Sequence, residues 1–327
     1  MRSIVLKIYV FFSGISYNQP KLCSNASWNQ SAITFANSSI IGSKPYDVFI
    51  DKNNTIYTID RSYSRILIRS EKNNISIKYT SSISFSSDSI FVTVDNDIYF
   101  EKYMHSIPFP LNSYDHNSID RWILDTNDSI PVKYLCSKCF DIFLDTNNNF
   151  YCSITNQHKV IMMPFNDLAN SVMVIAGTGA SGSMSHQLHD PYGIFVDINF
   201  NLYVADCGND RIQKFKFGET NGLATPGAEP TNNMLLFCPT AVVLDADNYL
   251  FIVDQNNHRI VRSGPNEMQC IVGCSGGGST PNRLAFPQGM AFDSYGNIYV
   301  ADRDNNRIQK FLLLSNSCGI SYIKDLS

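Results

Sequence analysis

One phrase recurs along this chain and constrains its fold more than any other feature. At Pro287–Phe311 it runs PQGMAFDSYGNIYVADRDNNRIQKF. We predict three short strands separated by two polar turns, because GMAF, IYVAD and RIQKF are β-rich and Gly296-Asn297 suits a tight hairpin. Further copies begin at Pro239 and Pro191. Such an internal repeat has to be identified first, because it decides the fold.

The copies agree in register. The first aspartate recurs every 48 residues in the last three copies, and an aromatic residue, a second aspartate and an arginine follow it after six, nine and fourteen positions. Weaker copies precede these, with Thr93, Ile154 and Lys159 as departures. The repeated charged residues are Asp51, Asp60, Arg65, Asp145, Asp197, Asp206, Arg211, Asp245, Asp254, Arg259, Asp293, Asp302 and Arg307. Six units follow from the aromatic positions, which are Tyr57, Tyr99, Tyr151, Tyr203, Phe251 and Tyr299.

Each unit ends in a further strand and a Gly/Ser-rich link, so each predicts a four-stranded sheet. One such sheet has open edges and cannot bury both of its faces, whereas six packed radially bury one another. The sequence therefore predicts an all-β fold, a six-bladed β-propeller, with blades starting near residues 45, 88, 138, 191, 239 and 287.

Two irregular segments qualify this pattern. A strand near residues 28–35 has no unit of its own, so we expect it to complete the last blade beside RIQKF; the tail segment GISYIKD is the competing candidate. In the second unit, an insertion from His105 to Ile119 precedes the expected third strand, DRWILD.

The repeated charges have a structural explanation. An aspartate at a turn accepts hydrogen bonds from nearby backbone N–H groups, and an arginine can pair with the second aspartate across the blade. A ring of carboxylates that binds cations is the alternative. Because the charges recur in nearly every unit, we favour the structural role and expect a functional site where the blades differ.

The three last copies resemble NHL repeats. YVADCGNDRIQKF, FIVDQNNHRIVRS and YVADRDNNRIQKF carry the resemblance, with Asn257-His258 before Arg259-Ile260 and lead-ins such as VIAGTGASG. It covers roughly residues 25–318, and is strong in units four to six and weak in units two and three. The resemblance implies a six-bladed propeller, NHL/TolB-like, similar to secreted NHL-repeat proteins of some invertebrates.

Several features favour export. Residues 1–16 have the arginine and apolar run of a signal peptide, which leaves residues 17–327 as one propeller. Sequons for N-glycosylation occur at Asn25, Asn29, Asn37, Asn53, Asn74 and Asn127. The net charge of −4 argues against a nucleic acid as the partner, and no apolar run is long enough to span a membrane. We therefore expect a secreted glycoprotein.

Nine cysteines fit an oxidising compartment. Cys23 and Cys318 flank the predicted ring closure, and Cys207 and Cys238 lie in loops on one face, so we expect Cys23–Cys318 and Cys207–Cys238 disulfides. Cys152 lies antiparallel to the segment that Cys136 and Cys139 begin, and either of these two can pair with it. Nine is odd, so at least one thiol is free or forms an intermolecular bond.

No motif for catalysis, metal or cofactor binding stands out. Amidating lyases with NHL-type propellers hold zinc through histidines. The six histidines here show no ligand pattern: they are His105, His116, His158, His186, His189 and His258. We therefore expect no cofactor and no metal, and favour a protein without catalytic activity.

Binding remains as the favoured function. Propellers present loops on a rigid ring, and the aromatic insertion is the candidate binding loop, through Tyr103, His105, Phe109, Tyr114 and His116. The expected partner is an extracellular protein or glycan. The alternatives are a metal-dependent propeller enzyme, a lyase or a lactone or ester hydrolase, and a cytosolic protein- or RNA-binding propeller.

Overall fold

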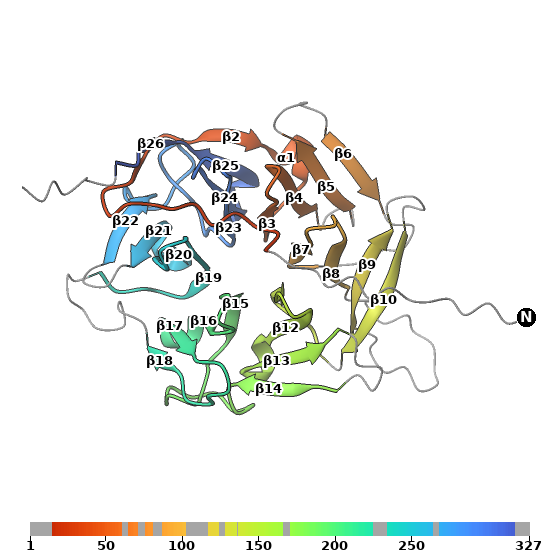
Figure 1. Ribbon diagram of the computed structural model, residues 1–327. Helices are drawn as coiled ribbons and strands as arrows, with labels where there is room; N and C mark the ends of the chain where they lie inside the picture. Colours follow the sequence, from red (N-terminus) through yellow and green to blue (C-terminus); the bar gives the residue numbers. More distant parts are fainter. Residues whose placement is uncertain are drawn as a thin grey trace, which may run out of the picture.

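The protein is a six-bladed β-propeller (Figure 1). The computed structural model describes residues 15–60, 65–70, 76–80, 87–102, 117–123, 128–135, 137–165, 171–224, 234–263 and 268–317, with the backbone alone for 76–80. Within these ranges the fold is nearly all β, with one short α-helix, α1 (Ser38–Ile41), and four 3₁₀ turns. The predicted fold class is confirmed.

Each blade is a four-stranded antiparallel sheet. Blades one to three contain β3 (Val48–Ile50), β4 (Thr55–Asp60), β5 (Arg65–Ser70) and β6 (Ser76–Thr80); β7 (Ile90–Val92), β8 (Ile98–Lys102), β9 (Asn117–Ile123) and β10 (Asp128–Leu135); and β11 (Ile142–Leu144), β12 (Asn149–Ile154), β13 (Lys159–Pro164) and β14 (Met173–Ala176).

The last three blades follow the same plan. They contain β15 (Pro191–Val196), β16 (Leu202–Asp206), β17 (Arg211–Phe215) and β18 (Leu223–Ala224); β19 (Pro239–Leu244), β20 (Leu250–Asp254), β21 (Arg259–Ser263) and β22 (Met268–Val272); and β23 (Met290–Phe292), β24 (Ile298–Asp302), β25 (Arg307–Phe311) and β2 (Ile33–Ala36).

The N-terminal part of the chain closes the ring. β2 pairs with β25 as the fourth strand of blade six, and β1 (Ser27–Trp28) pairs separately with β26 (Leu313–Ser315). The strand expected near residues 28–35 is thus two strands. The competing tail segment lies beyond residue 317, outside the described residues.

Blade two departs from the expectation in one place. Its third strand, β9, starts at Asn117, whereas the sequence predicted DRWILD from Asp120. Asn117 to Ile119 already pair with β10, and Ile119 also pairs with Glu101 of β8, so the hydrogen-bond ladder extends into the expected insertion.

The core lies between neighbouring blades. The second strands are buried along their whole length in blades two, four, five and six, because each lies in the middle of a sheet that is covered on both faces. No helix in the described ranges is long and apolar enough to cross a membrane.

The ring has two distinct faces. We call one the turn face, because it carries the turns between first and second strands. The other, the link face, carries the links between blades and the 3₁₀ turns η1 (Thr155–Gln157), η2 (Cys207–Asn209), η3 (Gln255–Asn257) and η4 (Arg303–Asn305). Backbone bonds hold these turns against the links, as from Gly208 N–H to His189 O at 2.8 Å.

Three disulfides lie within the described residues. They join Cys139 to Cys152, Cys207 to Cys238, and Cys270 to Cys274. The sequence analysis did not expect the last pair. Cys136 and Cys318 lie outside the described residues.

The Cys23–Cys318 pair therefore stays a proposal. The Cys23 N–H donates to Asn316 Oδ1 at 2.8 Å, which brings Cys23 close to the residue two positions before Cys318. Peptide mapping of the unreduced protein tests this pairing, and a different partner for either cysteine would exclude it.

Candidate functional site

The first repeated aspartate of each blade closes a turn. In five blades its Oδ1 accepts from the backbone N–H groups two and four positions later, at 2.8–3.0 Å. In blade two the Thr93 hydroxyl does the same for Asp97 N–H at 3.1 Å. These carboxylates are therefore used within their own turns.

The second repeated aspartate pairs with the repeated arginine. Arginine Nε lies 2.6–2.7 Å from the carboxylate in the pairs Asp60–Arg65, Asp206–Arg211, Asp254–Arg259 and Asp302–Arg307. Each of these aspartates is fully buried. In blade four, Arg211 also donates to the backbone oxygens of Ser183 and Gln187, which ties the link to the blade. These four pairs thus tie the second and third strands of their blades together.

The histidines of the repeat also bind backbone. Nδ1 of His158 accepts from Asp190 N–H, and Nδ1 of His258 accepts from Phe286 N–H, both at 3.1 Å. Asp210 and Asn306 take the same role for Cys238 and Lys44, at 2.7 and 2.8 Å. In blades three to six, this repeat position therefore links the blade to the segment that leads into the next one.

Most of the aromatic insertion, residues 103–116, lies outside the described residues, and with it Tyr103, His105, Phe109, Tyr114 and His116. Its flanking residues, Lys102 and Asn117, are the ends of β8 and β9 on the link face. His186 and His189 lie on the link before blade four. Among the described residues, no three His, Cys, Asp or Glu side chains are grouped as a metal site.

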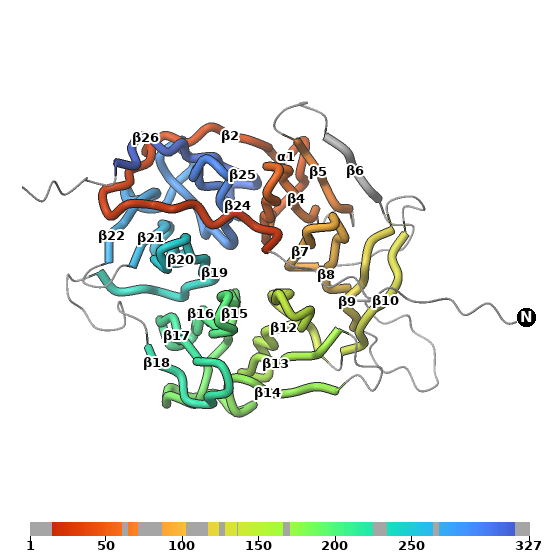
Figure 2. The backbone as a smooth tube through the Cα atoms, viewed as in Figure 1, coloured from red at the N-terminus to blue at the C-terminus, as the bar shows by residue number. Residues whose placement is uncertain are grey.

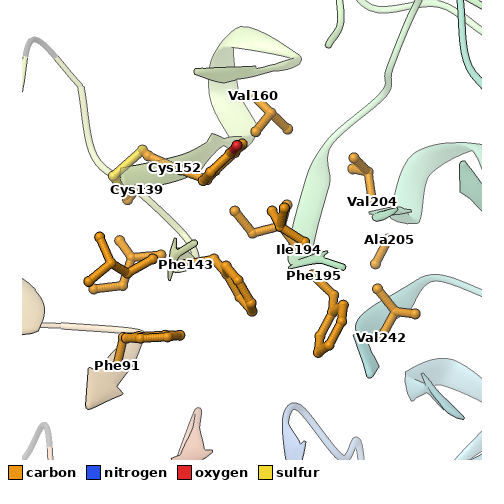
Figure 3. Close-up of a cluster of buried hydrophobic side chains, with 14 of the residues drawn as sticks. Phe91, Cys139, Phe143, Cys152, Val160, Ile194, Phe195, Val204, Ala205 and Val242 are labelled. Carbon is orange, nitrogen blue, oxygen red and sulfur yellow. A yellow bond between two sulfur atoms is a disulfide. The ribbon is translucent and has the colours of Figure 1, made fainter. Parts of the chain in front are cut away.

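The central channel is lined by the first strands. Four phenylalanines, Phe49, Phe91, Phe143 and Phe195, occupy the same register position in blades one to four. Their neighbouring ring centroids lie 5.2–5.3 Å apart, and Figure 3 shows three of them side by side. Val243 and Ala291 hold this position in blades five and six, so the aromatic wall covers one side of the channel.

An N-terminal segment closes the channel at the turn face. Residues 16–22, which we call the strap, cross this face toward the centre of the ring (Figure 2). Asn18 Nδ2 donates to the backbone oxygens of Asp51 and Phe292, at 2.8 and 3.2 Å. The Tyr17 ring packs edge-on against Phe143 and Phe195, at 5.6 and 5.3 Å. The remaining cavity, about 100 Å³, extends from Tyr17 toward the link face.

Two carboxyl groups line this cavity nearer the link face. Ser89 Oγ donates to Asp141 Oδ1 at 2.6 Å, and the Ser89 hydroxyl also lowers the pKa of Asp47. Backbone N–H groups of Val48 and Ile90 donate to Asp47, and that of Ile194 donates to Asp141, at 2.8–3.1 Å.

Both carboxyl groups have raised pKa values. Burial raises the pKa of Asp47 to about 6 and that of Asp141 to about 7, and the charge of Asp47 is the second cause for Asp141. The titrations of Asp47 and Asp141 are therefore coupled, and we call these two residues the carboxyl pair.

Aromatic rings surround the channel mouth on the link face. Phe140 lies 4.1 Å from Tyr192 and 6.4 Å from Tyr46 between centroids. Burial raises the pKa of Tyr192, and the charges of Asp190, Tyr46, Arg303 and Asp88 also act on it. Groups from several blades thus converge on one opening.

Arg303 supplies a cation at this mouth. Its guanidinium lies 5.8 Å from the Tyr46 ring, and its Nη1 donates to Gln288 Oε1 at 3.1 Å. Across the mouth, Lys138 Nζ lies 2.6 Å from Asp88 Oδ2. The described residues that line the cavity itself are aliphatic and aromatic apart from Asn18, Asp47 and Asp141, and they include no histidine.

The sequence analysis missed the carboxyl pair. Asp47, Ser89 and Asp141 stand four positions before the turn residue of their blades, where the other blades have Gly193, Ala241 and Gly289. The sequence did contain a clue: this position holds a polar residue in blades one to three and a glycine or alanine in the other three. Only the ring brings blades one, two and three together at that level.

Comparison with known proteins supports the fold. An NHL repeat model matches residues 284–311, so the chain is an NHL-type propeller. A protein of unknown function from Bacteroides thetaiotaomicron has a TM-score of 0.67 at 16% identity, covering 87% of this chain and 76% of that chain. Virginiamycin B lyase from Staphylococcus aureus has a TM-score of 0.59 at 14% identity, covering 88% and 100%.

A third similar structure is an auxiliary nutrient binding protein from Bacteroides thetaiotaomicron. Its TM-score is 0.65 at 12% identity, covering 92% of this chain and 76% of that chain. The comparison with curated proteins gave no match. At these identities the likeness concerns the fold alone.

Proposed function

We propose that this protein is an extracellular binding protein whose ligand occupies the channel mouth on the link face. One observation carries the proposal: side chains that differ between blades converge there, whereas the repeated charges are used within the blades. The strap and Tyr17 close the opposite end, so a ligand reaches the cavity from the link face. A similar fold in a nutrient binding protein agrees with this role.

Export is part of the proposal. Three disulfides among the described residues suit an oxidising compartment. Three of the described sequon asparagines, Asn25, Asn37 and Asn53, are exposed, and Asn29 is half-buried. We propose that a signal peptide is removed near residues 13–16 and that exposed sequons carry glycans.

The aromatic insertion is a proposed second part of the site. Because it joins Lys102 to Asn117 on the link face, its residues start and end on the face of the mouth. Replacing residues 104–115 by a short Gly/Asn turn is expected to weaken ligand binding and to leave the fold intact.

The experiment that tests the proposed function uses protein recovered from the medium of a secreting cell line. We would screen a library of extracellular small molecules, peptides and glycans by thermal shift, with wild type and with Asp47→Asn. We expect ligands that stabilise wild type and lose most of this effect in the variant. Ligands that stabilise both equally, or protein retained inside the cell, would contradict the proposal.

A second candidate function is acid–base catalysis. It is favoured by the carboxyl pair, whose pKa values near neutrality suit proton transfer, and by the lyase among the similar folds. Turnover of any screened ligand, lost in Asp141→Asn, would establish it. Elemental mass spectrometry of the secreted protein tests the metal-dependent form, which requires a stoichiometric metal ion.

A further inference from the structure

Two hydrogen-bond donors at the mouth have no acceptor among the described residues. Gln288 is 2% exposed, and its Oε1 accepts from Gln255 Nε2 at 2.6 Å and from Arg303 Nη1 at 3.1 Å. Its Nε2 has no hydrogen-bond partner among the described residues. An unpaired buried donor costs about 1–3 kcal/mol, so this amide is suited to a ligand that brings an oxygen.

Arg303 provides the second donor. Its Nε donates to Asp304 Oδ1 at 2.9 Å and its Nη1 to Gln288, while its Nη2 donates to none of the described residues. The guanidinium lies 5.8 Å from both the Tyr46 and the Phe286 rings, and the side chain is 22% exposed. A fixed, partly exposed guanidinium with an unused edge suits a carboxylate.

The acceptors of the mouth lie next to these donors. Gly289 follows Gln288, and a Cβ atom at Gly289 would lie 2.9 Å from Asp47 Oδ1. Asp47 lies close enough to Asp141 for its charge to act on that carboxyl, and Asp141 accepts from Ser89 Oγ, so the carboxyl pair starts at this point and continues to blade three. Ionised, it would attract an ammonium group.

We propose that the channel mouth binds a zwitterion, a small molecule with an ammonium group near a carboxylate, as in an amino acid or a short peptide. The ammonium group contacts Asp47 and Asp141, and the carboxylate contacts Arg303 and Gln288. This inference rests on the proposed function and narrows its ligand, which the sequence analysis expected to be a protein or glycan.

The size of the site agrees with a small ligand. The cavity of about 100 Å³ lies well below the roughly 300–1,000 Å³ of pockets that enclose drug-sized molecules. It can enclose an ammonium group, while the rest of the ligand lies between Tyr46, Phe140 and Tyr192.

Binding should be linked to protons. With pKa values of about 6 and about 7, the carboxyl pair is partly protonated near neutral pH, and an incoming ammonium group favours its doubly ionised form. The other charged groups near the pair are Asp88, Lys138 and Arg303, and the phenols are Tyr46, Tyr192 and Tyr17. We expect proton release on binding and an affinity that increases as the pH rises from about 6 to about 8.

The test is isothermal titration calorimetry of the full chain with free amino acids and dipeptides, in buffers of different ionisation heat. The N-acetyl and the carboxamide derivatives of each hit serve as blocked analogues. We expect binding by unblocked ligands, release of a proton, and a loss of about 30-fold or more when either group is blocked.

Two variants locate the ligand. Asp141→Asn and Arg303→Met should each weaken binding by about 30-fold or more, with circular dichroism and melting temperature showing that both remain folded. Arg303→Lys should recover part of the affinity. Asp210→Asn is the matched control. It removes a carboxylate on the same face and introduces the residue that blade six has at the equivalent position, Asn306, so it should bind as wild type does.

Several outcomes would overturn the inference. Equal binding of blocked and unblocked ligands, or binding that survives both mouth variants, would exclude the zwitterion. The proposed function would still stand if a different ligand depended on Asp47. If no screened molecule depended on Asp47, the proposed function would fail as well.

Discussion

Blades four and five have the same turn aspartate but surround it differently. In blade four, Asp197 Oδ2 accepts from Asn201 Nδ2 at 2.8 Å and from the Tyr203 hydroxyl at 3.4 Å. Blade five has Tyr249 and Phe251 at these two positions, so fully buried Asp245 keeps an Oδ2 with no hydrogen-bond partner among the described residues. Burial raises the pKa of Asp245 to about 6.

The cation of blade five explains part of this difference. In blade six, Lys310 Nζ lies 3.5 Å from Asp293 Oδ2. The equivalent residue of blade five, Arg262, donates to the backbone oxygens of Cys23 and Ser24, just after the strap. Blade five thus directs a cation to the ring closure. Arg262 therefore bonds to the N-terminal segment, whereas Lys310 pairs with the turn aspartate of its own blade, blade six.

The largest expected effect concerns a contact that both blades keep. Arg211→Met in blade four and Arg259→Met in blade five should each lower the free energy of unfolding by about 3–5 kcal/mol, because a buried carboxylate loses its cation. Urea denaturation measures this. A loss below about 1 kcal/mol, the scale of an exposed ion pair, would show that the pairs are not structural.

The second largest expected effect is a pH dependence of stability that comes from blade five. The folded pKa of Asp245 lies above the unfolded value of about 3.9, so the folded state keeps a proton that the unfolded state has lost. Stability should therefore fall as the pH rises from about 4 to about 6, by at most about 3 kcal/mol from this group.

Asp245→Asn should remove this component, as seen by urea denaturation over the same pH range. The carboxyl pair adds a decline of the same sign that extends to about pH 7. A pH profile unchanged by the substitution would contradict the assignment to Asp245.

Two substitutions should give blade four the arrangement of blade five, in which Oδ2 of the turn aspartate has no side-chain donor. The double variant Asn201→Tyr/Tyr203→Phe removes both side-chain donors from Asp197 Oδ2 and should cost about 2 kcal/mol at neutral pH. It should also make stability fall more steeply with rising pH. Stability equal to wild type at all pH values would show that these donors are dispensable.

The reverse change should give the smallest effect. Phe251→Tyr in blade five places a hydroxyl donor near Asp245 Oδ2, as in blade four, and should raise the free energy of unfolding by about 1 kcal/mol at neutral pH. Thermal and urea denaturation measure the gain. The gain should disappear in Phe251→Tyr/Asp245→Asn, and a gain that persists there would have another cause.

The sequence predicted most of the fold, because the repeat fixes the strands, the turns and their register. It also pointed to the charged residues that pair in four of the blades, such as Asp206 and Arg211. The N-terminal strap was not predicted, since residues 16–22 match no repeat and two of their hydrogen bonds reach residues more than 200 positions away in blades five and six.

The candidate site was harder to predict for a related reason. Asp47 and Asp141 are 94 positions apart, and Gln288 and Arg303 belong to another blade. Their proximity depends on closing the ring, and the pKa values of the carboxyl pair depend on burial by several blades.

A crystal structure with the tightest ligand of the screen tests the central claim most directly. We expect ligand density at the link-face mouth, in contact with Asp47 or Asp141 and with Arg303, above a cavity that Tyr17 still closes. Density on the outer strands or on the turn face, with an empty mouth, would contradict the account.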